Sequence, residues 1–430
     1  MDSPCLFMSH EIKSIRARWV LDSRGNPTIE ATVSTARHSA SAIVPSGAST
    51  GLHEAKELRD GGKAFAGNGV EKAVANVNKK ISKKLHGFDV TEQRAIDEAM
   101  MELDGTKNKS KLGANAILAV SLACAGTAAK ELGVPLYQRI GVLAKNRNFS
   151  LPVPCMNIIN GGVHAGNDLD VQEFMLAPIR AKSFSEAVRI CSEIYHLLKM
   201  LLKDKHGAQA VNVGDEGGFA PPISSATNAL DFMENAVSEL GYSRKVKFAL
   251  DVAASELYDE QRNSYMFEGK PRSAEWMLDF YDDISSDYPI FSIEDPFSQD
   301  DWDSFVTLTH GLGTKFQVVG DDLLVTSPER IGRAIAVKAA NALLLKVNQV
   351  GTLTESIDAS RLAMKNSWNV MVSHRSGETE DTFIADLAVG LGCGQIKAGA
   401  PCRGERTAKY NRLLHIESEM KRPAYGIKGL

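Results

Sequence analysis

The chain has 430 residues, of which 43% are hydrophobic and 24% are charged. This length and composition, with a mean hydropathy of −0.16, predict a folded protein with a large core and exclude a disordered chain. The formal net charge of −4 gives no indication of a nucleic-acid partner.

Targeting and redox signals are weak along the whole chain. The first residues lack a long apolar core, and no run of about 18 apolar residues occurs, so we expect neither a signal peptide nor a membrane span. The six cysteines are scattered and form no CxxC pair, which indicates reduced thiols rather than a zinc site or a disulfide framework. These features predict a cytoplasmic protein.

The N-terminal third mixes strand-like and helical patterns. Residues 15–21 and 28–34 are strand-like and are joined by the turn-rich sequence DSRGNP. Helical patterns follow over residues 91–104 and 115–133, and Gly133 ends the second as a C-cap. We therefore expect a small domain with both α and β elements.

A polar stretch at residues 143–149 precedes the sequence LPVP, and we place the domain boundary there. A long amphipathic helix is predicted soon after it, over residues 183–205, where Ser183 and Glu186 have the spacing of a capping box. The predicted division is an extension at 1–9, a capping domain at 10–145 and a catalytic domain at 146–430.

Short apolar runs in the second part each end in an ionisable group. The runs are KFALD, IFSIE, FQVVGD, ALLLK, VMVSH and QIK, and they end at Asp251, Glu294, Asp321, Lys346, His374 and Lys397. Helical segments such as SPERIGRAIAVKAA lie between several of them. This alternation predicts an α/β barrel, in which reactive groups lie at the carboxyl ends of the strands.

Three of these strand ends are acidic: Asp251, Glu294 and Asp321. Carboxylates that converge in a barrel mouth would repel one another and tend to protonate unless a cation binds between them. Ligands that are all oxygen favour Mg²⁺ or Mn²⁺ over zinc. For any one acid, a salt bridge to a nearby lysine or arginine is the alternative; the pattern of three favours a metal.

Lys346 follows the apolar run ALLL. Burial and a neighbouring cation would lower the pKa of its ammonium group, which would make it a usable general base. The alternative is a structural lysine paired with one of the acids, and spacing alone does not decide between the two.

Two further carboxyl groups and two glycine-rich loops complete the candidate site. Glu216 lies between small residues in VNVGDEGGFAPP, and Glu173 is placed after a strand, facing the same region. Two carboxyls that flank a leaving group could supply acid catalysis, whereas either alone would be a surface charge.

The loops VPSGASTGLHE and NGGVHAGN could close over a substrate or could be ordinary tight turns.

The segment SHRSGETED places His374, Arg375 and Ser376 before an expected helix start. An arginine and a hydroxyl near a helix N-terminus form a reasonable phosphate site, to which Lys397 could add charge. The alternative for Arg375 is a surface salt bridge to one of the acids that follow it.

Several long motifs occur together in this chain: DSRGNPT, VPSGASTG, VGDEGG, SIEDPF, VGDD, LLLKVNQ, SHRSGETEDTFIAD and IKAGAPCRGER. On these motifs the chain resembles the enolase family from about Ile12 to Gly426, in the family's order and spacing. The resemblance implies an α/β fold, with a small N-terminal α+β domain and a modified TIM-type barrel that begins ββαα before six βα units.

The resemblance also implies a lyase that interconverts 2-phosphoglycerate and phosphoenolpyruvate with two Mg²⁺ ions per site. It assigns Lys346 as the base that removes the C2 proton, and Glu216 as the acid that assists loss of the C3 hydroxyl, with Glu173 beside it. The implied metal ligands are Asp251, Glu294 and Asp321 for the tighter ion and Ser49 for the second. The implied substrate-binding residues are His164, Gln172, His374, Arg375, Ser376 and Lys397.

No functional position of the family is substituted, and the departures are peripheral, such as the extension before about His10. The resemblance implies at least a homodimer and no nucleic-acid or membrane partner. Two alternatives stay open: another proton-abstracting enzyme of the superfamily, and a non-catalytic scaffold or binding protein with the same fold.

Overall fold

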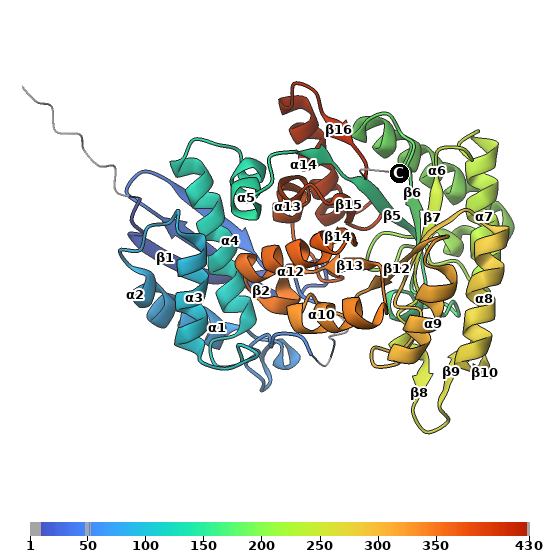
Figure 1. Ribbon diagram of the computed structural model, residues 1–430, viewed down its shortest axis with the longest axis horizontal. Coiled ribbons are helices and arrows are strands. Elements are labelled where there is room, and N and C mark those ends of the chain that lie inside the picture. Colours follow the sequence, from blue (N-terminus) through green and yellow to red (C-terminus); the bar gives the residue numbers. More distant parts are fainter. Residues whose placement is uncertain (1–9, 48–50, 52, 428–430) are drawn as a thin grey trace, which may run out of the picture.

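A computed structural model describes residues 10–47, 51 and 53–427. A small N-terminal unit lies beside a larger barrel, as Figure 1 shows. The expected extension at 1–9 and the predicted metal ligand Ser49 lie outside the described residues.

The N-terminal unit is built on a three-stranded antiparallel sheet in the order β1-β2-β3. The predicted strands are confirmed as β1 (Ser14–Leu21) and β2 (Pro27–Ser34), and β3 (Ser39–Ile43) is added. The turn between β1 and β2 is fixed by Asp22, whose carboxylate accepts hydrogen bonds from the backbone N–H groups of Arg24 and Asn26 at 2.9 and 2.8 Å.

Helices cover one face of this sheet. The two predicted helices are confirmed as α3 (Gln93–Asp104) and α4 (Ala114–Glu131), and α4 is buried along almost its whole length. The remaining elements of this unit are η1 (Ala64–Gly67), α1 (Glu71–Asn76), the π-helical η2 (Val77–Ile81), α2 (Ser82–Leu85) and α5 (Leu136–Ala144).

The second unit is a closed eight-stranded barrel in the order β11-β12-β13-β14-β15-β5-β6-β7. Its strands are β5 (Val153–Asn160), β6 (Glu173–Ala177), β7 (Lys247–Asp251), β11 (Ile290–Glu294), β12 (Gln317–Gly320), β13 (Ala342–Leu345), β14 (Asn369–Ser373) and β15 (Gly394–Lys397). Only β6 runs antiparallel to its neighbours. Two helices, α6 (Phe184–His206) and α7 (Ala226–Glu239), follow β6 before the regular βα alternation begins, which confirms the expected ββαα(βα)6 arrangement.

Helices surround the barrel on its outside. After α6 and α7 they are α8 (Ala274–Asp287), α9 (Trp302–Leu312), α10 (Pro328–Val337), α12 (Leu353–Lys365), α13 (Phe383–Leu391) and α14 (Gly404–Glu419), with the short α11 (Val347–Val350) after β13. The long helix α6 begins where its capping signal predicts, because the Ser183 hydroxyl accepts a hydrogen bond from Glu186 N at 3.1 Å.

Smaller elements decorate the barrel. They are η3 (Gly162–His164), η4 (Ala208–Val211), η5 (Ala254–Leu257), the sheet of β8 (Tyr258–Asp259), β9 (Ser264–Phe267) and β10 (Lys270–Arg272), and the pair β4 (Ser150–Leu151) and β16 (Ala424–Tyr425). Within the described residues, no single helix has both the length and the apolar composition to cross a membrane; only α4 and α5 taken together do, and they meet at 108°.

The barrel interior is packed rather than hollow. Small and large apolar side chains fill it, from Val153, Cys155, Met175, Ala177, Ala249, Phe291, Val319, Ala342, Leu344 and Met371. Within the interior, Gln317 and Gln395 exchange side-chain hydrogen bonds of 3.1 and 3.0 Å. This packing leaves the open mouth at the carboxyl ends of the parallel strands as the place for polar chemistry.

The predicted strand ends meet at that mouth. Asp251, Glu294 and Lys397 are the last residues of β7, β11 and β15, and Asp321, Lys346 and His374 follow β12, β13 and β14 directly. The expectation that Glu173 follows a strand is wrong, because Glu173 is the first residue of β6. Since β6 is antiparallel, its first residue still lies at the mouth, opposite Asp251 in the register.

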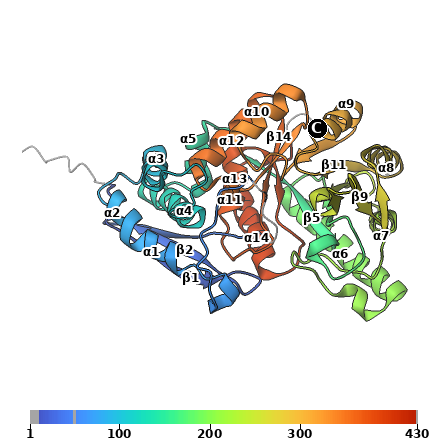
Figure 2. The ribbon, with the colours of Figure 1, turned by 90° about the horizontal axis from the view of Figure 1, so that it is seen from below.

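The two units are joined through a buried carboxylate on α3. Asp97 is fully buried and accepts hydrogen bonds from the backbone N–H and the hydroxyl of Thr354, at 3.0 and 2.6 Å. The neighbouring Ser121 hydroxyl accepts from Leu353 N at 3.0 Å. These contacts attach α3 and α4 to the start of α12, and Figure 2 shows these helices side by side.

We expect Asp97→Ala to destabilise the protein by about 2–4 kcal/mol, because it leaves buried donors of Thr354 without an acceptor. The matched control is Arg94→Ala, which removes an exposed ion pair to Asp358 at 2.8 Å between the same two helices and should cost less than about 1 kcal/mol. Urea unfolding of the two variants tests this, and equal midpoints would contradict the assignment of Asp97 as the main polar link.

Candidate active site

The mouth of the barrel holds one strongly polar cavity. It is lined by Gly47, His164, Gln172, Glu173, Glu216, Asp251, Ala253, Asp295, Asp321, Asp322, Lys346, Ser373, His374, Arg375, Ser376 and Lys397. Every predicted site residue among the described residues is in this lining except Glu294, which contacts Lys397 directly. The sequence-based set therefore converges in space.

Lys397 is the centre of this arrangement. Its Nζ donates hydrogen bonds to Asp251 Oδ2 at 2.8 Å and to the two Glu294 oxygens at 3.0 and 2.9 Å, and it lies 3.1 Å from Glu173 Oε1. Burial lowers the pKa of the Lys397 ammonium, but Asp251, Glu173 and Glu294 outweigh burial and hold this pKa well above its ordinary value. One ammonium group thus compensates three buried carboxyls.

Negative charge remains in excess at the mouth. Burial and then Asp251 raise the pKa of Glu294 well above its ordinary value. The next residue, Asp295, belongs to a second group of acids. Its carboxylate accepts hydrogen bonds from the backbone N–H groups of Asp321 and Asp322 at 2.9 and 2.7 Å. Burial and Asp321 raise the pKa of Asp322 to about 7. More carboxyls are gathered here than the nearby lysines can keep ionised.

This excess of carboxyls is suited to binding a divalent cation. The buried donors Asp251, Glu294 and Asp321 offer only oxygen, which suits a hard ion such as Mg²⁺. The salt-bridge alternative also describes the contacts, since each of these acids pairs with Lys397 or Lys346. Sequence reasoning missed Asp295 and Asp322, although both doublets, in SIEDPF and VGDD, carry the signal of a second adjacent acid.

Lys346 is largely enclosed, with its side chain 14% exposed, and its Nζ donates a hydrogen bond to Asp321. The expected lowering of its pKa presupposes a neighbouring cation, and without one the pKa moves in the other direction. Burial does lower the pKa of Lys346, but Asp321 and Glu294 outweigh burial and raise it above its ordinary value. The expectation considered burial and a bound cation. It did not consider the carboxylates that would bind that cation, which raise the pKa of Lys346.

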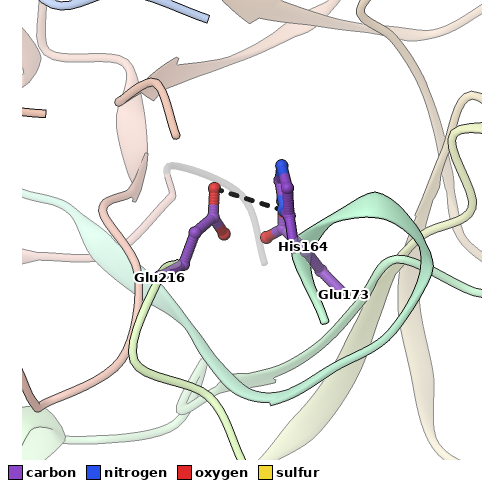
Figure 3. A group of neighbouring side chains, drawn as sticks. All are labelled: His164, Glu173 and Glu216. Atoms are coloured by element: carbon purple, nitrogen blue, oxygen red, sulfur yellow. Dashed lines mark ion pairs between the residues drawn. The ribbon is translucent and has the colours of Figure 1, made fainter. Parts of the chain in front are cut away.

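Glu173, Glu216 and His164 form a compact group on the other side of the cavity (Figure 3). His164 Nδ1 lies 3.7 Å from Glu216 Oε1 and 4.0 Å from Glu173 Oε1. Burial and the neighbouring Glu216 raise the pKa of Glu173 well above its ordinary value. The raised pKa favours the protonated form of Glu173.

Glu216 has the opposite shift. Burial alone would raise its pKa, but the neighbouring rings of His374 and His164 and the charged groups of Arg406 and Lys397 hold it well below its ordinary value. Burial and Arg406 push the pKa of His374 itself well below normal, although Glu216 raises it. His374 therefore supplies a dipole, and the fixed charges of Arg406 and Lys397 stabilise the ionised Glu216.

The glycines of VGDEGG allow Glu216 to approach β5 closely. A Cβ atom on Gly218 would lie 2.8 Å from Asn160 Oδ1 and 3.1 Å from Ile159 N, so only glycine fits there. This approach lets Asn157 donate a hydrogen bond to Glu216 Oε2 at 3.1 Å. Sequence reasoning missed Asn157, because a single asparagine inside an apolar strand carries no signal of its role.

Arg375 is buried, and its expected surroundings are partly wrong. Its guanidinium donates to Glu54 at 3.0 Å and to Asn348 Oδ1 at 2.9 Å, rather than pairing on the surface with the acids that follow it. The expected helix start is also absent, since α13 begins only at Phe383. The intervening residues form a loop, so the N-terminus of α13 does not follow directly on Ser376.

A family model described as "Enolase, N-terminal domain" matches residues 12–140, and one described as "Enolase, C-terminal TIM barrel domain" matches residues 148–427. This chain belongs to the enolase family.

Similar proteins come from distant organisms. The chain is 57% identical to a protein named enolase from Thermococcus gammatolerans, over 96% of this chain and 95% of that one. It is 57% identical to an enolase of Methanocaldococcus jannaschii, over 95% and 96%, and 54% identical to enolase B of Dictyostelium discoideum, over 96% and 95%. The similarity to enolases thus covers both units.

We expect Lys397→Met to destabilise the protein by about 3–5 kcal/mol at pH 8, because it leaves three buried carboxyls without their cation. Lys409→Met is the matched control, since Lys409 is equally buried but pairs, among the described residues, with the single carboxylate of Glu378 at 2.7 Å. Urea unfolding in EDTA at pH 5 and pH 8 measures both.

The sign of the pH dependence follows from proton binding. The pKa of Lys397 is raised, so its contribution is complete below the ordinary lysine pKa of about 10.4. Without it, the pKa values of Glu173 and Glu294 rise further, and the folded variant binds more protons than the unfolded chain. The stability deficit of Lys397→Met should therefore grow from pH 5 to pH 8. A deficit that stays constant, or that matches Lys409→Met, would contradict this charge balance.

Proposed function

We propose that this protein catalyses the reversible, Mg²⁺-dependent dehydration of 2-phosphoglycerate to phosphoenolpyruvate, as a lyase of glycolysis and gluconeogenesis. The observation that carries the proposal is the group of charged strand ends at one barrel mouth, in a chain of the enolase family. A base, a proton-holding carboxyl pair and a surplus of oxygen ligands are the groups that this reaction requires.

Asp251, Glu294 and Asp321 would hold the tighter Mg²⁺ ion, and Ser49 would help to hold a second. When bound, the ions supply the positive charge that stabilises the ene-diolate formed after proton removal. The raised pKa of Glu294 in the absence of a cation supports this assignment.

Lys346 would remove the C2 proton, because its Nζ reaches into the cavity from the end of β13. Its raised pKa means that it must first give up a proton that Asp321 stabilises, and positive charge bound at Asp321 removes that stabilisation. The acid would be Glu216 together with Glu173, with the resident proton on Glu173 and the carboxylate of Glu216 next to it.

The remaining cavity residues would bind the substrate. His164, Gln172, His374, Arg375 and Ser376 would surround its phosphate and hydroxyl groups, and Lys397 would face its carboxylate. Because Arg375 is paired with Glu54 in this structure, a phosphate group would compete with Glu54 for the guanidinium.

We further propose a cytoplasmic homodimer or higher homo-oligomer without nucleic-acid or membrane partners, and a domain division at 10–145 and 146–430. Exposed apolar side chains on β1, Trp19 at 42% and Leu21 at 52%, are candidates for a subunit contact. Sedimentation of the purified protein tests the oligomeric state, and a monomer at all concentrations would refute it.

Turnover of 2-phosphoglycerate is the direct test of the activity. We expect the ultraviolet absorbance of phosphoenolpyruvate to rise when substrate and Mg²⁺ are added, to stop rising with EDTA and to recover with Mg²⁺ in excess. A folded, Mg²⁺-loaded protein without turnover would refute the proposal. Another α-proton substrate of the superfamily, or a scaffold role, would then be tested.

We expect Lys346→Ala to lower kcat by at least about 10³-fold, since general-base removal usually costs about 10² to 10⁴. Lys315→Ala is the control, because Lys315 is half-exposed and pairs with Asp282 at 2.7 Å; it should retain full activity. A Lys346→Ala variant within about tenfold of the unmodified enzyme would exclude Lys346 as the base.

A further inference from the structure

Arg406, at the start of α14, is a fully buried arginine. Its guanidinium donates hydrogen bonds to the backbone oxygens of Arg375 and Ser376, both at 2.7 Å, and to that of Asp215 at 3.0 Å. A carboxylate oxygen of Glu405 lies 3.5 Å from its Nε. These carbonyls belong to the loop after β14 and to the turn that carries Glu216, so one guanidinium joins both.

The same guanidinium contacts the ring of His374. Arg406 Nη1 lies 2.6 Å from His374 Nδ1. A guanidinium only donates hydrogen bonds and keeps its charge at every pH at which proteins are folded. The ring nitrogen at this distance must therefore be the acceptor. His374 can satisfy that requirement only as the neutral imidazole with its proton on Nε2.

The other ring nitrogen faces the cavity. His374 Nε2 lies 3.4 Å from Glu216 Oε1, and within the described residues it is buried without a hydrogen-bond partner. His374 itself is 2% exposed and lines the cavity. Its N–H is therefore a fixed donor aimed at the ionised Glu216 and at whatever polar atom occupies the cavity beside it.

We propose that Arg406 is a positioning residue that locks His374 as the neutral Nε2–H tautomer, so that His374 donates toward Glu216 and does not titrate in the working pH range. The charged groups that face His374 are Arg406, Glu216, Lys397 and Lys346. Three of them are cations that oppose protonation of the ring, and Arg406 also occupies the nitrogen that a second proton would need. The effect on turnover rests on the proposed function, whereas the tautomer does not.

The tautomer is tested in the unmodified protein by ¹⁵N NMR of histidine-labelled protein, with the His374 signals assigned by their loss in His374→Asn. We expect one unprotonated nitrogen and one N–H nitrogen, assigned to Nδ1 and Nε2, with unchanged shifts from pH 6 to pH 9. A proton on Nδ1, or a titration within this range, would overturn the proposal whether or not the protein converts 2-phosphoglycerate.

The role in the reaction is tested by pH profiles of kcat/KM for three variants. Arg406→Met should lower kcat/KM by at least about tenfold and add an ionisation near the ordinary histidine pKa of about 6.5. Arg406→Lys, which keeps a donor, should restore part of the activity without the new ionisation. The double variant Arg406→Met with His374→Asn should not show the new ionisation, because it has no histidine at this position.

Each outcome decides. An added ionisation that persists in the double variant would show that it does not arise from His374 and would overturn the proposal. A uniform loss of activity at every pH in Arg406→Met would assign Arg406 a structural role only. Should Arg406→Met fail to fold, Arg406→Lys and the NMR measurement decide, since neither depends on that variant.

Discussion

The ion cluster of Lys397 with Asp251, Glu294 and Glu173 is the interaction on which the mouth of this barrel depends. Parallel strands bring their ends together whatever those ends carry, and here three of the six ionisable ends, Asp251, Glu294 and Asp321, carry carboxyls. The single ammonium of Lys397, at 2.8–3.1 Å from Asp251, Glu294 and Glu173, makes their burial possible, because uncompensated charges in a protein interior are expensive. Lys397 does not neutralise all of the negative charge of these carboxyls, and a bound cation would neutralise more of it.

The ionisable groups around this cluster form two halves of the cavity, and the two halves differ in which groups hold protons. Around β12 and β13, Asp321 keeps Lys346 protonated. Near β5 and β6, the raised pKa of Glu173 favours its protonated form and the lowered pKa of Glu216 favours its ionised form. Cations and proton donors on opposite sides of one cavity are the arrangement needed to remove a proton from one carbon and to protonate a group leaving the next. The fold produces this separation because the two halves come from different strands.

Much of this arrangement was predictable from sequence, because each strand end carried its ionisable group at the end of an apolar run. The six groups from Asp251 to Lys397 all reach the mouth, and α3, α4 and α6 form where their periodicity indicates. The antiparallel direction of β6 was not readable from periodicity, since a short buried strand has the same pattern in either direction. Glu173 was therefore placed at the wrong end of its strand, although in the right site.

Protonation states were the least predictable property. The pKa of Lys346 depends on the balance between burial and the carboxylates that approach it, and this balance is a matter of ångströms that sequence spacing does not contain. Asn157 and Arg406 were missed for a related reason. Asn157 contacts Glu216, 59 residues away in sequence, and Arg406 contacts His374, 32 residues away. Neither belongs to a pattern of similar residues.

The division between a proton-removing half and a proton-donating half is tested most directly by exchange of the C2 proton. The experiment incubates 2-phosphoglycerate with Mg²⁺ and each variant in D₂O, and follows loss of the C2 proton signal by NMR separately from formation of phosphoenolpyruvate. Glu216→Gln should lose dehydration and still exchange the C2 proton, whereas Lys346→Ala should lose both. Exchange at the unmodified rate by Lys346→Ala, or loss of exchange in Glu216→Gln with Lys346 intact, would contradict the division.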